Sequence, residues 1–395
     1  MSAVKLLPGV YWVGVVDWNV RAFHGHTYIT RRGSTYNSYL IVDEKIALVD
    51  TVYAPFSDQL LRNIAEIVPP EKIDYIISNH GETDHSGSLP ALKKACPNAK
   101  HFGTAKVKET LEKMYYLGLD LQVVKSGDKL SLGKKTLSFI EAPMLHWPDS
   151  MFTYLIEDGL LMPNDAFGQH FASSARFDDE VDSSPLFEEA EAYFANILWP
   201  FSPMVLRKID EIVKMKLPLK MIAPSHGIIW RKDPMKIVNS YVEWGKQTTR
   251  RKAVIAYETM WKSTEKMAYS IVDGLVSEGI DVKMYDVAET DSTEIIREML
   301  YARGYLFGSS THDNGMLPNL AMFLEFLKGL KPSGRKAAAF GSFGWGGGAV
   351  KEMEKFIATP GIEIVQPGIS LKFVPSPEEL KQCFEFGKEF AKKLT

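Results

Sequence analysis

The most constraining feature of the sequence is a regular alternation of strand and helix patterns that fills residues 251–395. The five strand-like runs are AVIAY at 253–257, VKMYD at 282–286, YLFGS at 305–309, AAAFGS at 337–342 and IEIV at 362–365. Each run is followed by a helical pattern, beginning near Thr264, 292, Pro318, Ala349 and 377. Short connections between strands and helices favour parallel strands with helices on both faces. The pattern therefore predicts a doubly wound parallel sheet.

Residues 1–250 have a different sequence pattern, in which short strand-like runs are more common than helical ones. Strands are predicted at Tyr11–Val16, Tyr39–Val42, Ile46–Val49, Ile73–Ser78, Thr136–Glu141, Met151–Ile156, Leu160–Met162 and Met221–Ala223. Helical patterns lie between some of them, at 88–95, 105–116, 187–198 and 203–215. The polar stretch GKQTTRRK at 245–252 lies between the two kinds of sequence pattern. We therefore expect one domain over 1–250 and a second over 251–395.

Composition narrows the class of protein. The chain of 395 residues has a net charge of −3, and this balance offers no basic surplus for nucleic acid or an anionic membrane. No apolar run approaches the roughly 18 residues that a membrane span requires. The first residues show no signal-peptide pattern, and Cys96 and Cys383 lie too far apart to make a disulfide framework. We expect a cytoplasmic enzyme.

Side chains of metal-ligating type gather directly after strand-like runs in the first domain. The segment DYIISNHGETDHSGSL carries four of them within six residues, and the segments ending in MLHW, MPND and PSHG carry one each. These candidate ligands are His80, Glu82, Asp84, His85, His146, Asp165 and His226. Loops at strand ends can converge at one edge of a sheet while the strands hold them rigidly.

The number of candidate ligands predicts two metals rather than one. Several imidazoles and three carboxylates are more than a single tetrahedral Zn²⁺ needs. Asp165 is a plausible bridge between two adjacent metals, because a carboxylate has two oxygens. A single histidine of this kind would be read as an ordinary core or surface residue, but all of them together, each at a strand end, argue against that reading.

The pattern H-x-[EH]-x-D-H, followed by His, Asp and His at strand ends, resembles the metallo-β-lactamase fold. The resemblance implies an αββα sandwich with a binuclear metal site. Hydrolases of that superfamily usually have His where this chain has Glu82. An anionic oxygen in place of an imidazole shifts the preference from zinc toward iron or manganese. Glu82 therefore favours redox chemistry over hydrolysis.

Three loops of the second domain predict a phosphate and ring-binding site. In AYETMWKSTEKMA, hydroxyl residues lie between a strand and a helix start, where backbone N–H groups favour a phosphate. Alone, this loop is a weak signal that an ordinary helix cap at Ser263 or Thr264 explains better, and it matches neither a Walker loop nor a dinucleotide fingerprint. GSSTHDNG at 308–315 and GSFGWGGGA at 341–349 follow the third and fourth strands, at the edge where this fold binds ligands.

The three loops together resemble short-chain flavodoxin, which implies FMN as the cofactor. The residues expected to contact FMN are Thr259, Met260, Trp261, Ser263, Thr264, Ser309, Ser310, Thr311, Asn314, Ser342, Phe343, Gly344, Trp345, Gly346 and Gly347. Trp345 has a second possible place, between the two cofactors, where it would act in catalysis. Glu258 stands where the resembling sequences more often have Asp, and Gly81 where Thr is frequent.

The two parts joined in one chain resemble the flavodiiron proteins, the A-type flavoproteins that include rubredoxin:oxygen oxidoreductase. Segments such as YWVGVVDWN, EAPMLHWPDSMFTY, PNDAFGQH and IAPSHGIIW carry the resemblance over nearly the whole chain. It implies reduction of O₂ to water, NO to N₂O, or both, at two non-haem irons supplied by FMN. By this resemblance one iron is held by His80, Glu82 and His146 and the other by Asp84 and His226, while Asp165 bridges.

The same resemblance assigns further roles. His85 matches a position that binds iron in some members and not in others. A His of the HG segment, here His24, and Tyr193 approach the distal pocket, and His170 is a candidate for orienting a ligand. Members form head-to-tail homodimers that bring the FMN of one subunit near the irons of the other, and a dimer of dimers is open. The electron donor is a separate protein or cofactor, rubredoxin first and reduced deazaflavin F420 second.

Two other classes of function stay open at this point. One is a metallo-β-lactamase-type hydrolase with a regulatory flavodoxin domain, which zinc content and esterase activity would support. The other is a gas sensor or electron carrier whose metals bind without turnover. An F420H₂-dependent oxidase is an alternative within the same family.

Overall fold

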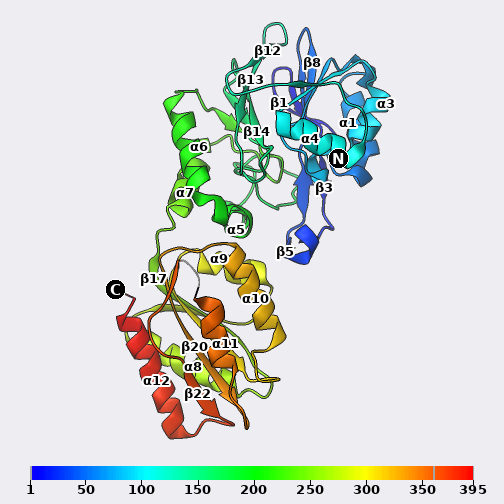
Figure 1. Cartoon of the computed structure of the whole chain (residues 1–395). Helices are drawn as coiled ribbons and strands as arrows, with labels where there is room; N and C mark the ends of the chain where they lie inside the picture. Colours follow the sequence, from blue (N-terminus) through cyan, green and yellow to red (C-terminus); the bar gives the residue numbers. More distant parts are fainter. Residues whose placement is uncertain (1, 359–360, 395) are drawn as a thin grey trace. The chain divides into compact units, whose positions relative to one another are not determined.

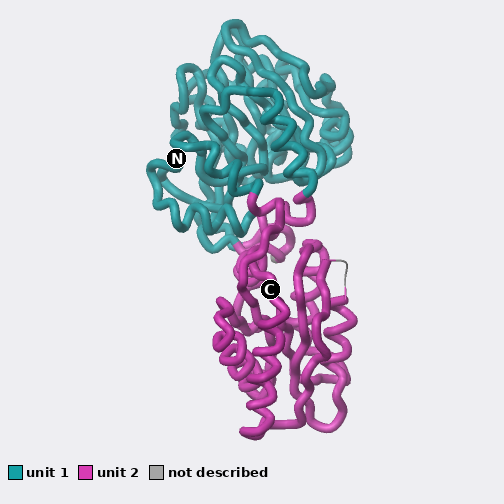
Figure 2. The backbone as a smooth tube through the Cα atoms, turned by 90° about the vertical axis from the view of Figure 1, so that its left-hand side faces the viewer, with its two compact units in different colours: residues 1–21, 30–193, 203–242 teal, residues 22–29, 194–202, 243–395 magenta. Residues whose placement is uncertain are grey.

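The computed structural model describes residues 2–358 and 361–394 (Figure 1). The chain divides into two compact units (Figure 2). The first is built from residues 1–21, 30–193 and 203–242, and the second from 22–29, 194–202 and 243–395. The domain boundary near residue 250 stays a prediction, because two short earlier segments also belong to the second unit. No helix in the described ranges is long and apolar enough to cross a membrane.

Two β-sheets form the centre of the first unit. The larger sheet has the order β1 (Val4–Leu7), β2 (Val10–Trp12), β7 (Tyr39–Val42), β8 (Ile46–Val49), β9 (Tyr75–Ile77), β10 (Lys100–Gly103) and β11 (Leu121–Val123). The smaller has the order β12 (Lys129–Ser131), β13 (Thr136–Glu141), β14 (Met151–Leu155), β15 (Leu160–Met162) and β16 (Met221–Ile222). A short ribbon pairs β3 (Val15–Asp17) with β6 (Ser34–Tyr36).

The two sheets share one apolar core. Alternate residues of the larger sheet, such as Tyr39 and Ile41, pack in one cluster with alternate residues of the smaller sheet, such as Leu137 and Phe139. A period of two puts such residues on one face of each strand, so the two inner faces lie against each other. Helices cover the outer faces, and the architecture is the predicted metallo-β-lactamase-like sandwich.

The helices of the first unit fall into two groups (Figure 1). On the larger sheet are α1 (Ser57–Ala65), α3 (Leu89–Ala95) and α4 (Ala105–Tyr115), and a single turn, α2 (Thr83–Ser86), follows β9. Beside the smaller sheet are α6 (Ser202–Lys214) and α7 (Pro234–Gly245). The predicted helix over 187–198 begins earlier, as α5 (Ser183–Tyr193), and continues as a π-helical segment, η4 (Phe194–Leu198).

The second unit is a parallel sheet with helices on both faces. Its strands have the order β18 (Asp281–Asp286), β17 (Arg250–Glu258), β19 (Ala302–Ser310), β20 (Arg335–Phe343) and β21 (Ile362–Ile364), and all pairs are parallel. The helices are α8 (Ser263–Ser277), α9 (Ser292–Met299), α10 (Pro318–Gly329), α11 (Ala349–Ile357) and α12 (Pro377–Lys392). The predicted doubly wound sheet is confirmed, with its topological switch at β17.

The core of this unit explains how its helices divide. Alternate β17 residues, Ala253 and Ile255, pack in one cluster with Ile271 of α8 and Phe390 of α12. These two helices therefore share one face of the sheet. Figure 1 shows α9, α10 and α11 on the opposite side. The hairpin of β4 (Ala22–Phe23) and β5 (Tyr28–Ile29) also belongs to this unit, because Ile29 N donates to Thr293 Oγ1 of α9 at 2.8 Å.

Two local predictions differ from the structure. The single strand expected over Tyr11–Val16 is divided into β2 and β3 around Gly14, where a Cβ would lie 2.3 Å from the carbonyl oxygen of Tyr36. The last sheet position is filled by two pieces, β21 and β22 (Ile369–Lys372), and both pair with β20. The second piece puts one more strand end at the ligand-binding edge.

Candidate metal centre and flavin pocket

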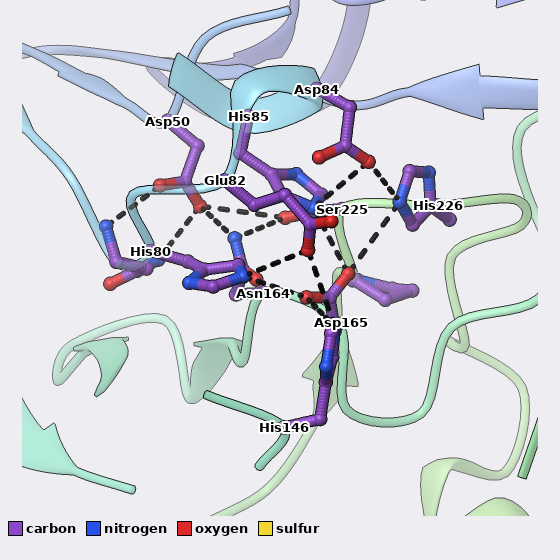
Figure 3. Close-up of polar contacts among 12 residues, drawn as sticks. Asp50, His80, Glu82, Asp84, His85, His146, Asn164, Asp165, Ser225 and His226 are labelled. Atoms are coloured by element: carbon purple, nitrogen blue, oxygen red, sulfur yellow. Dashed lines mark hydrogen bonds and ion pairs between the residues drawn. The ribbon is translucent and has the colours of Figure 1, made fainter. Parts of the chain in front are cut away.

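The seven candidate metal ligands lie together at one edge of the sandwich (Figure 3). His80 follows β9 of the larger sheet, and Asp84 and His85 lie on α2 just beyond it. Asp165 and His226 follow β15 and β16 of the smaller sheet. The remaining two, Glu82 and His146, lie on the loops after β9 and β13. Strand ends of both sheets therefore supply the group, as the sequence predicts.

The first cluster contains His80, Glu82, His146 and Asp165, whose ligand atoms all lie within 4.8 Å of one another. The Nε2 atoms of His80 and His146 lie 3.2 and 3.5 Å from Glu82 Oε2. The same two nitrogens lie 3.7 and 3.4 Å from Asp165 Oδ2. Two imidazoles and two carboxylates thus face a common point, which is the donor arrangement of a metal site.

The second cluster contains Asp84, His85 and His226. The Nε2 atoms of His85 and His226 lie 3.3 and 3.1 Å from Asp84 Oδ2. They also lie 3.1 and 3.5 Å from Asp165 Oδ1. Asp165 therefore turns one oxygen to each cluster. This geometry supports its predicted place between two metals.

The buried atoms of this group fit two cations. Among the described residues, Asp84 Oδ1, Asp165 Oδ2 and both ring nitrogens of His85 have no hydrogen-bond partner. A buried polar atom without a partner costs free energy, and the cost is larger for a charged group. Cations bound at the two clusters would satisfy Asp165 Oδ2 and His85 Nε2, the two of these atoms that face the clusters. The three carboxylates among the donors favour iron or manganese over zinc.

A second site lies at the carboxyl edge of the parallel sheet in the second unit. It is a cavity of about 460 Å³ lined by residues of four strand-end loops. Its lining residues are Met260, Trp261, Ser263, Ser310, Thr311, Asp313, Asn314, Ser342, Phe343, Gly344, Trp345, Gly346, Phe373 and Val374. Eleven of the fifteen residues expected to contact FMN are among them; Asp313, Phe373 and Val374 were not expected. The last two follow β22, the strand piece that the sequence pattern did not reveal.

Hydroxyl groups gather where the lining residues Ser310 and Ser342 meet the buried Thr264, which does not itself line the cavity. Thr264 Oγ1 lies 3.1 Å from Ser310 Oγ and 3.0 Å from Ser342 Oγ. The buried Thr259 Oγ1 has no hydrogen-bond partner among the described residues. These hydroxyls lie where α8 begins, so the end of the helix with free N–H groups and positive dipole is next to them. The combination fits a phosphate group.

The outer side of the pocket is aromatic. Trp261 and Trp345 are 87% and 93% exposed, and Phe373 is 56% exposed. Exposed aromatic side chains around one cavity are unusual, because such rings normally bury their faces. A flat ring lying between them would cover these faces. A phosphate and a planar ring are the two ends of flavin mononucleotide, in which a ribityl chain joins them.

One predicted FMN contact, Ser309, and the neighbouring Glu258, which was not predicted to contact FMN, have structural roles. Ser309 Oγ donates to the carbonyl of Ser310 at 2.8 Å and accepts from Leu317 N at 2.9 Å, so it braces the loop. Glu258, at the end of β17, accepts from Asn319 Nδ2 at 2.7 Å and from Leu320 N at 2.9 Å. Its carboxylate therefore caps the first turn of α10.

The comparisons with known proteins agree with both sites. Residues 35–227 match the model of the ODP family beta lactamase, and residues 255–387 match the flavodoxin model. A protein named nitric oxide reductase from Moorella thermoacetica is 49% identical over 99% of this chain and 98% of its own length. The chain belongs to the flavodiiron protein family.

Solved structures support the same assignment. Rubredoxin oxygen:oxidoreductase from Desulfovibrio gigas superposes on this flavodiiron protein with a TM-score of 0.97 at 38% identity, covering 100% of this chain and 98% of the other. The flavodiiron protein from Giardia intestinalis gives a TM-score of 0.95 at 37% identity, covering 100% and 97%. The likeness therefore extends over both units of the chain.

The carboxylates of this flavodiiron protein create a field that favours positive charge. Burial opposes protonation of His85, yet Asp84 and Asp165 raise its pKa to about 9. Burial likewise opposes protonation of His80, but hydrogen bonds to Asp149 and Glu82 hold its pKa well above the usual value. The pKa of Asp165 is held well below its usual range by His85 and His146, against the effect of burial. The carboxylates therefore favour positive charge on the imidazoles beside them.

Neighbouring groups orient the ligands. Asp149 Oδ1 lies 2.7 Å from His80 Nδ1, and its Oδ2 accepts from Gly81 N at 3.0 Å. His226 Nδ1 donates to the carbonyl of Thr35 at 2.7 Å. In both rings the partner of Nδ1 leaves Nε2 facing the cluster, a common device in metal sites. A Cβ on Gly81 would lie 2.8 Å from Asp149 Oδ2, so glycine gives that carboxylate room.

The candidate catalytic residues lie in different places. Tyr193 donates its hydroxyl to Asp165 Oδ1 at 2.9 Å, and burial together with Asp165 holds its pKa well above the usual value. His170 packs 4.9 Å from the His226 ring and lies 2.8 Å from Ser34 Oγ. His24 is exposed in the turn η1 (His24–His26) of the second unit, and Trp345 lies at the flavin pocket. Roles for His24, Tyr193 and Trp345 in catalysis stay predictions.

One side of the metal centre is open. The side chains of Glu82, Asp84 and His146 are 18%, 13% and 10% exposed. Those of the other four candidate ligands are at most 2% exposed. The three partly exposed ligands therefore mark the side on which the clusters lie nearest to solvent.

Proposed function

We propose that this flavodiiron protein is an oxidoreductase that reduces NO to N₂O, O₂ to water, or both, at two irons supplied with electrons by FMN. The observation that carries the proposal is the pair of adjacent ligand clusters that share Asp165 and include Glu82. A hydrolytic zinc pair has no need of the extra carboxylate. Names of similar proteins, nitric oxide reductase and rubredoxin oxygen:oxidoreductase, point to the same two gases.

The proposed ligand assignment follows the distances. His80, Glu82 and His146 hold one iron, Asp84, His85 and His226 the other, and Asp165 both. Bound flavin and iron together supply one-electron steps and the storage of several electrons, which two NO molecules or one O₂ require. The protein groups orient these ligands and hold a proton at the Tyr193 hydroxyl, beside the shared carboxylate.

The hydroxyl-rich and aromatic pocket of the second unit is the proposed FMN site. The metal centre and this pocket belong to different compact units of the chain. We therefore include a head-to-tail homodimer, alone or as a dimer of dimers, in which the flavin of one chain serves the irons of another. Rubredoxin or another small carrier is the proposed donor, and it would reach the flavin at its exposed tryptophans.

The test begins with the metal and flavin content of the purified full-length protein. We expect two irons and one FMN per chain, followed by anaerobic consumption of NO, and consumption of O₂, with a rubredoxin and rubredoxin-reductase supply of electrons. Zinc in place of iron, together with esterase or lactamase activity, would overturn the proposal in favour of a hydrolase. Iron and flavin without turnover of either gas would favour a sensor or carrier.

A further inference from the structure

We infer that Lys262 is a specificity-determining residue of the flavin pocket, whose positive charge offsets nearby carboxylates and thereby favours FMN over flavins that lack a phosphate. The inference rests on the proposed FMN site. Lys262 lies between Trp261 and Ser263, which both line the pocket, and it directly precedes α8. Its side chain is 64% exposed.

The backbone of Lys262 adopts a conformation that favours glycine. Its φ of 65° and ψ of 9° lie in the left-handed region, where the Cβ of an ordinary L-residue is crowded. Its side chain makes no capping hydrogen bond to α8, so helix capping does not explain a lysine at this position. A non-glycine residue held in this conformation beside a binding site points to a function of its side chain.

Carboxylates surround the ammonium group of Lys262. Its Nζ lies 3.2 Å from Glu265 Oε1, and the same oxygen accepts from the hydroxyl of Tyr257 at 3.0 Å. The hydrogen bond to Glu265 raises the pKa of Lys262 above its usual value, and the charges of Asp286 and Glu289 act in the same direction. Lys262 is therefore the positive member of a group that contains three carboxylates.

These carboxylates lie at the edge of the sheet where the hydroxyl cluster lies. Glu265 is in the first turn of α8, one residue after Thr264, whose Oγ1 is within 3.1 Å of two serine hydroxyls. Asp286 ends β18 and pairs with Tyr257 near the end of β17. Glu289 follows in the turn after β18, where its N donates to Asp286 O at 3.2 Å. All three therefore lie at the strand ends from which the proposed phosphate loop starts.

The balance of charge at this edge determines how well it accepts a phosphate. A phosphate monoester carries about −1.5 to −2 charges at pH 7. The N–H groups at the start of α8 attract it, whereas each nearby carboxylate repels it. Glu265 stabilises the first turn of α8 through the same helix dipole, so a residue that favours the helix opposes the ligand. The ammonium group of Lys262 reduces this repulsion.

The test compares Lys262→Gln with the unchanged full-length protein after removal of the flavin. The flavin-free proteins are titrated with FMN and, separately, with riboflavin, which has the same ring system but no phosphate, and flavin fluorescence reports binding. At about 10 mM ionic strength we expect FMN to bind about 3- to 10-fold more weakly to K262Q. At about 1 M salt the difference should fall below about twofold, because salt screens exposed charges. Riboflavin binding should not change.

Three further variants separate the charge of Lys262 from the structure of its loop. Lys262→Arg keeps the charge and should bind FMN like the unchanged protein. Lys262→Gly removes the charge and relieves the left-handed backbone, so it should weaken FMN binding as K262Q does, without a fall in melting temperature. Glu265→Gln removes a carboxylate and keeps an acceptor for the Tyr257 hydroxyl, and it should strengthen FMN binding at low salt.

Lys328→Gln is the matched control. Lys328 Nζ lies 3.3 Å from Glu325 Oε2 in a pair with the same three-residue spacing, and the lysine side chain is 51% exposed. Lys328 is in the last turn of α10, and helices that connect parallel strands run back toward the amino edge of the sheet, away from the flavin pocket. K328Q therefore removes the same charge from a similar ion pair, and FMN binding should stay unchanged.

The pattern across the variants gives the answer. A salt-sensitive loss of FMN affinity in K262Q and K262G, recovered in K262R and absent for riboflavin, supports the inference. Unchanged FMN affinity of K262Q at low salt, an equal loss of FMN and riboflavin, or an equal loss in K328Q overturns it. An unchanged protein that binds no FMN would refute both the inference and the proposed function. One that binds FMN but reduces neither gas would refute the proposed function alone, because the titrations need no turnover.

Discussion

The metal centre and the flavin pocket both lie at the carboxyl ends of strands, yet they are formed by different kinds of side chain. The metal centre consists of buried charged side chains that further hydrogen bonds hold in place, and Asp165 is 2% exposed. The flavin pocket consists of hydroxyls, glycines and exposed aromatic rings, with Trp345 93% exposed. A small cation requires charged ligands fixed at short distances from it. A planar ring requires flat surfaces on its faces and a backbone that can approach it closely.

Because the two sites share no residues, we expect that a substitution can remove the ligand of one site without removing the ligand of the other. A change in the metal centre should leave the flavin bound, because no candidate metal ligand lines the flavin pocket. A change in the flavin pocket should leave the metals bound while it stops their supply of electrons. Substitutions that break one site at a time therefore test the contrast.

The largest expected effect is that of Asp165→Ala. This change removes the one carboxylate that faces both clusters, so both metals should be lost and turnover should fall by more than about 100-fold. Iron analysis and anaerobic NO consumption measure the result. FMN content should equal that of the unchanged protein, and retention of two irons would contradict the shared role.

Glu82→His should have the next largest effect. The change replaces an anionic oxygen with an imidazole in the first cluster, which lowers the preference for iron over zinc. We expect lower iron occupancy and a drop in terminal reductase activity of about 10- to 100-fold, with flavin retained. Full activity in this variant would show that the assignment of Glu82 is wrong.

A smaller effect is expected in the flavin pocket. Thr264→Val keeps the shape of the side chain and removes the hydroxyl that lies near Ser310 and Ser342. The loss of a hydrogen bond to a charged phosphate costs about 1.5–3 kcal/mol, so FMN should dissociate at least about 10-fold more readily. Fluorescence titration of flavin-free protein measures this. Iron content is the control and should not change.

The smallest effect should follow from Tyr193→Phe. The change removes one hydrogen bond to Asp165, worth about 1 kcal/mol, and leaves every candidate ligand in place. We expect both irons to stay bound and turnover to fall by about 10-fold or less. A complete loss of turnover with normal metal content would instead give the phenol an obligatory part in the reaction.

The sequence predicted the parts of the fold that rest on short, strongly patterned segments. Strands at Tyr39–Val42, Ile46–Val49, Thr136–Glu141 and Leu160–Met162 agree residue by residue with the structure. The ligand residues also lie where the pattern of apolar run and polar end predicts. The π-helical segment after Tyr193 was not foreseeable, because its five residues read as the continuation of a helix.

The supporting residues could not be predicted for a physical reason. Asp149 orients a ligand that is distant in the chain, and its importance depends on which strand ends meet in space. Asp149 had one local signal, its position three residues after His146. Phe373 and Val374 were missed because β22 is a short strand piece with an irregular pattern, although the loop after it completes the flavin pocket.

The most direct test of the central claim is anomalous X-ray diffraction, at the iron absorption edge, from crystals of the purified protein. The account predicts two iron peaks on either side of Asp165, separated by about 3.5–4 Å as in other two-metal sites. A single peak, or peaks that appear only at the zinc edge, would contradict it.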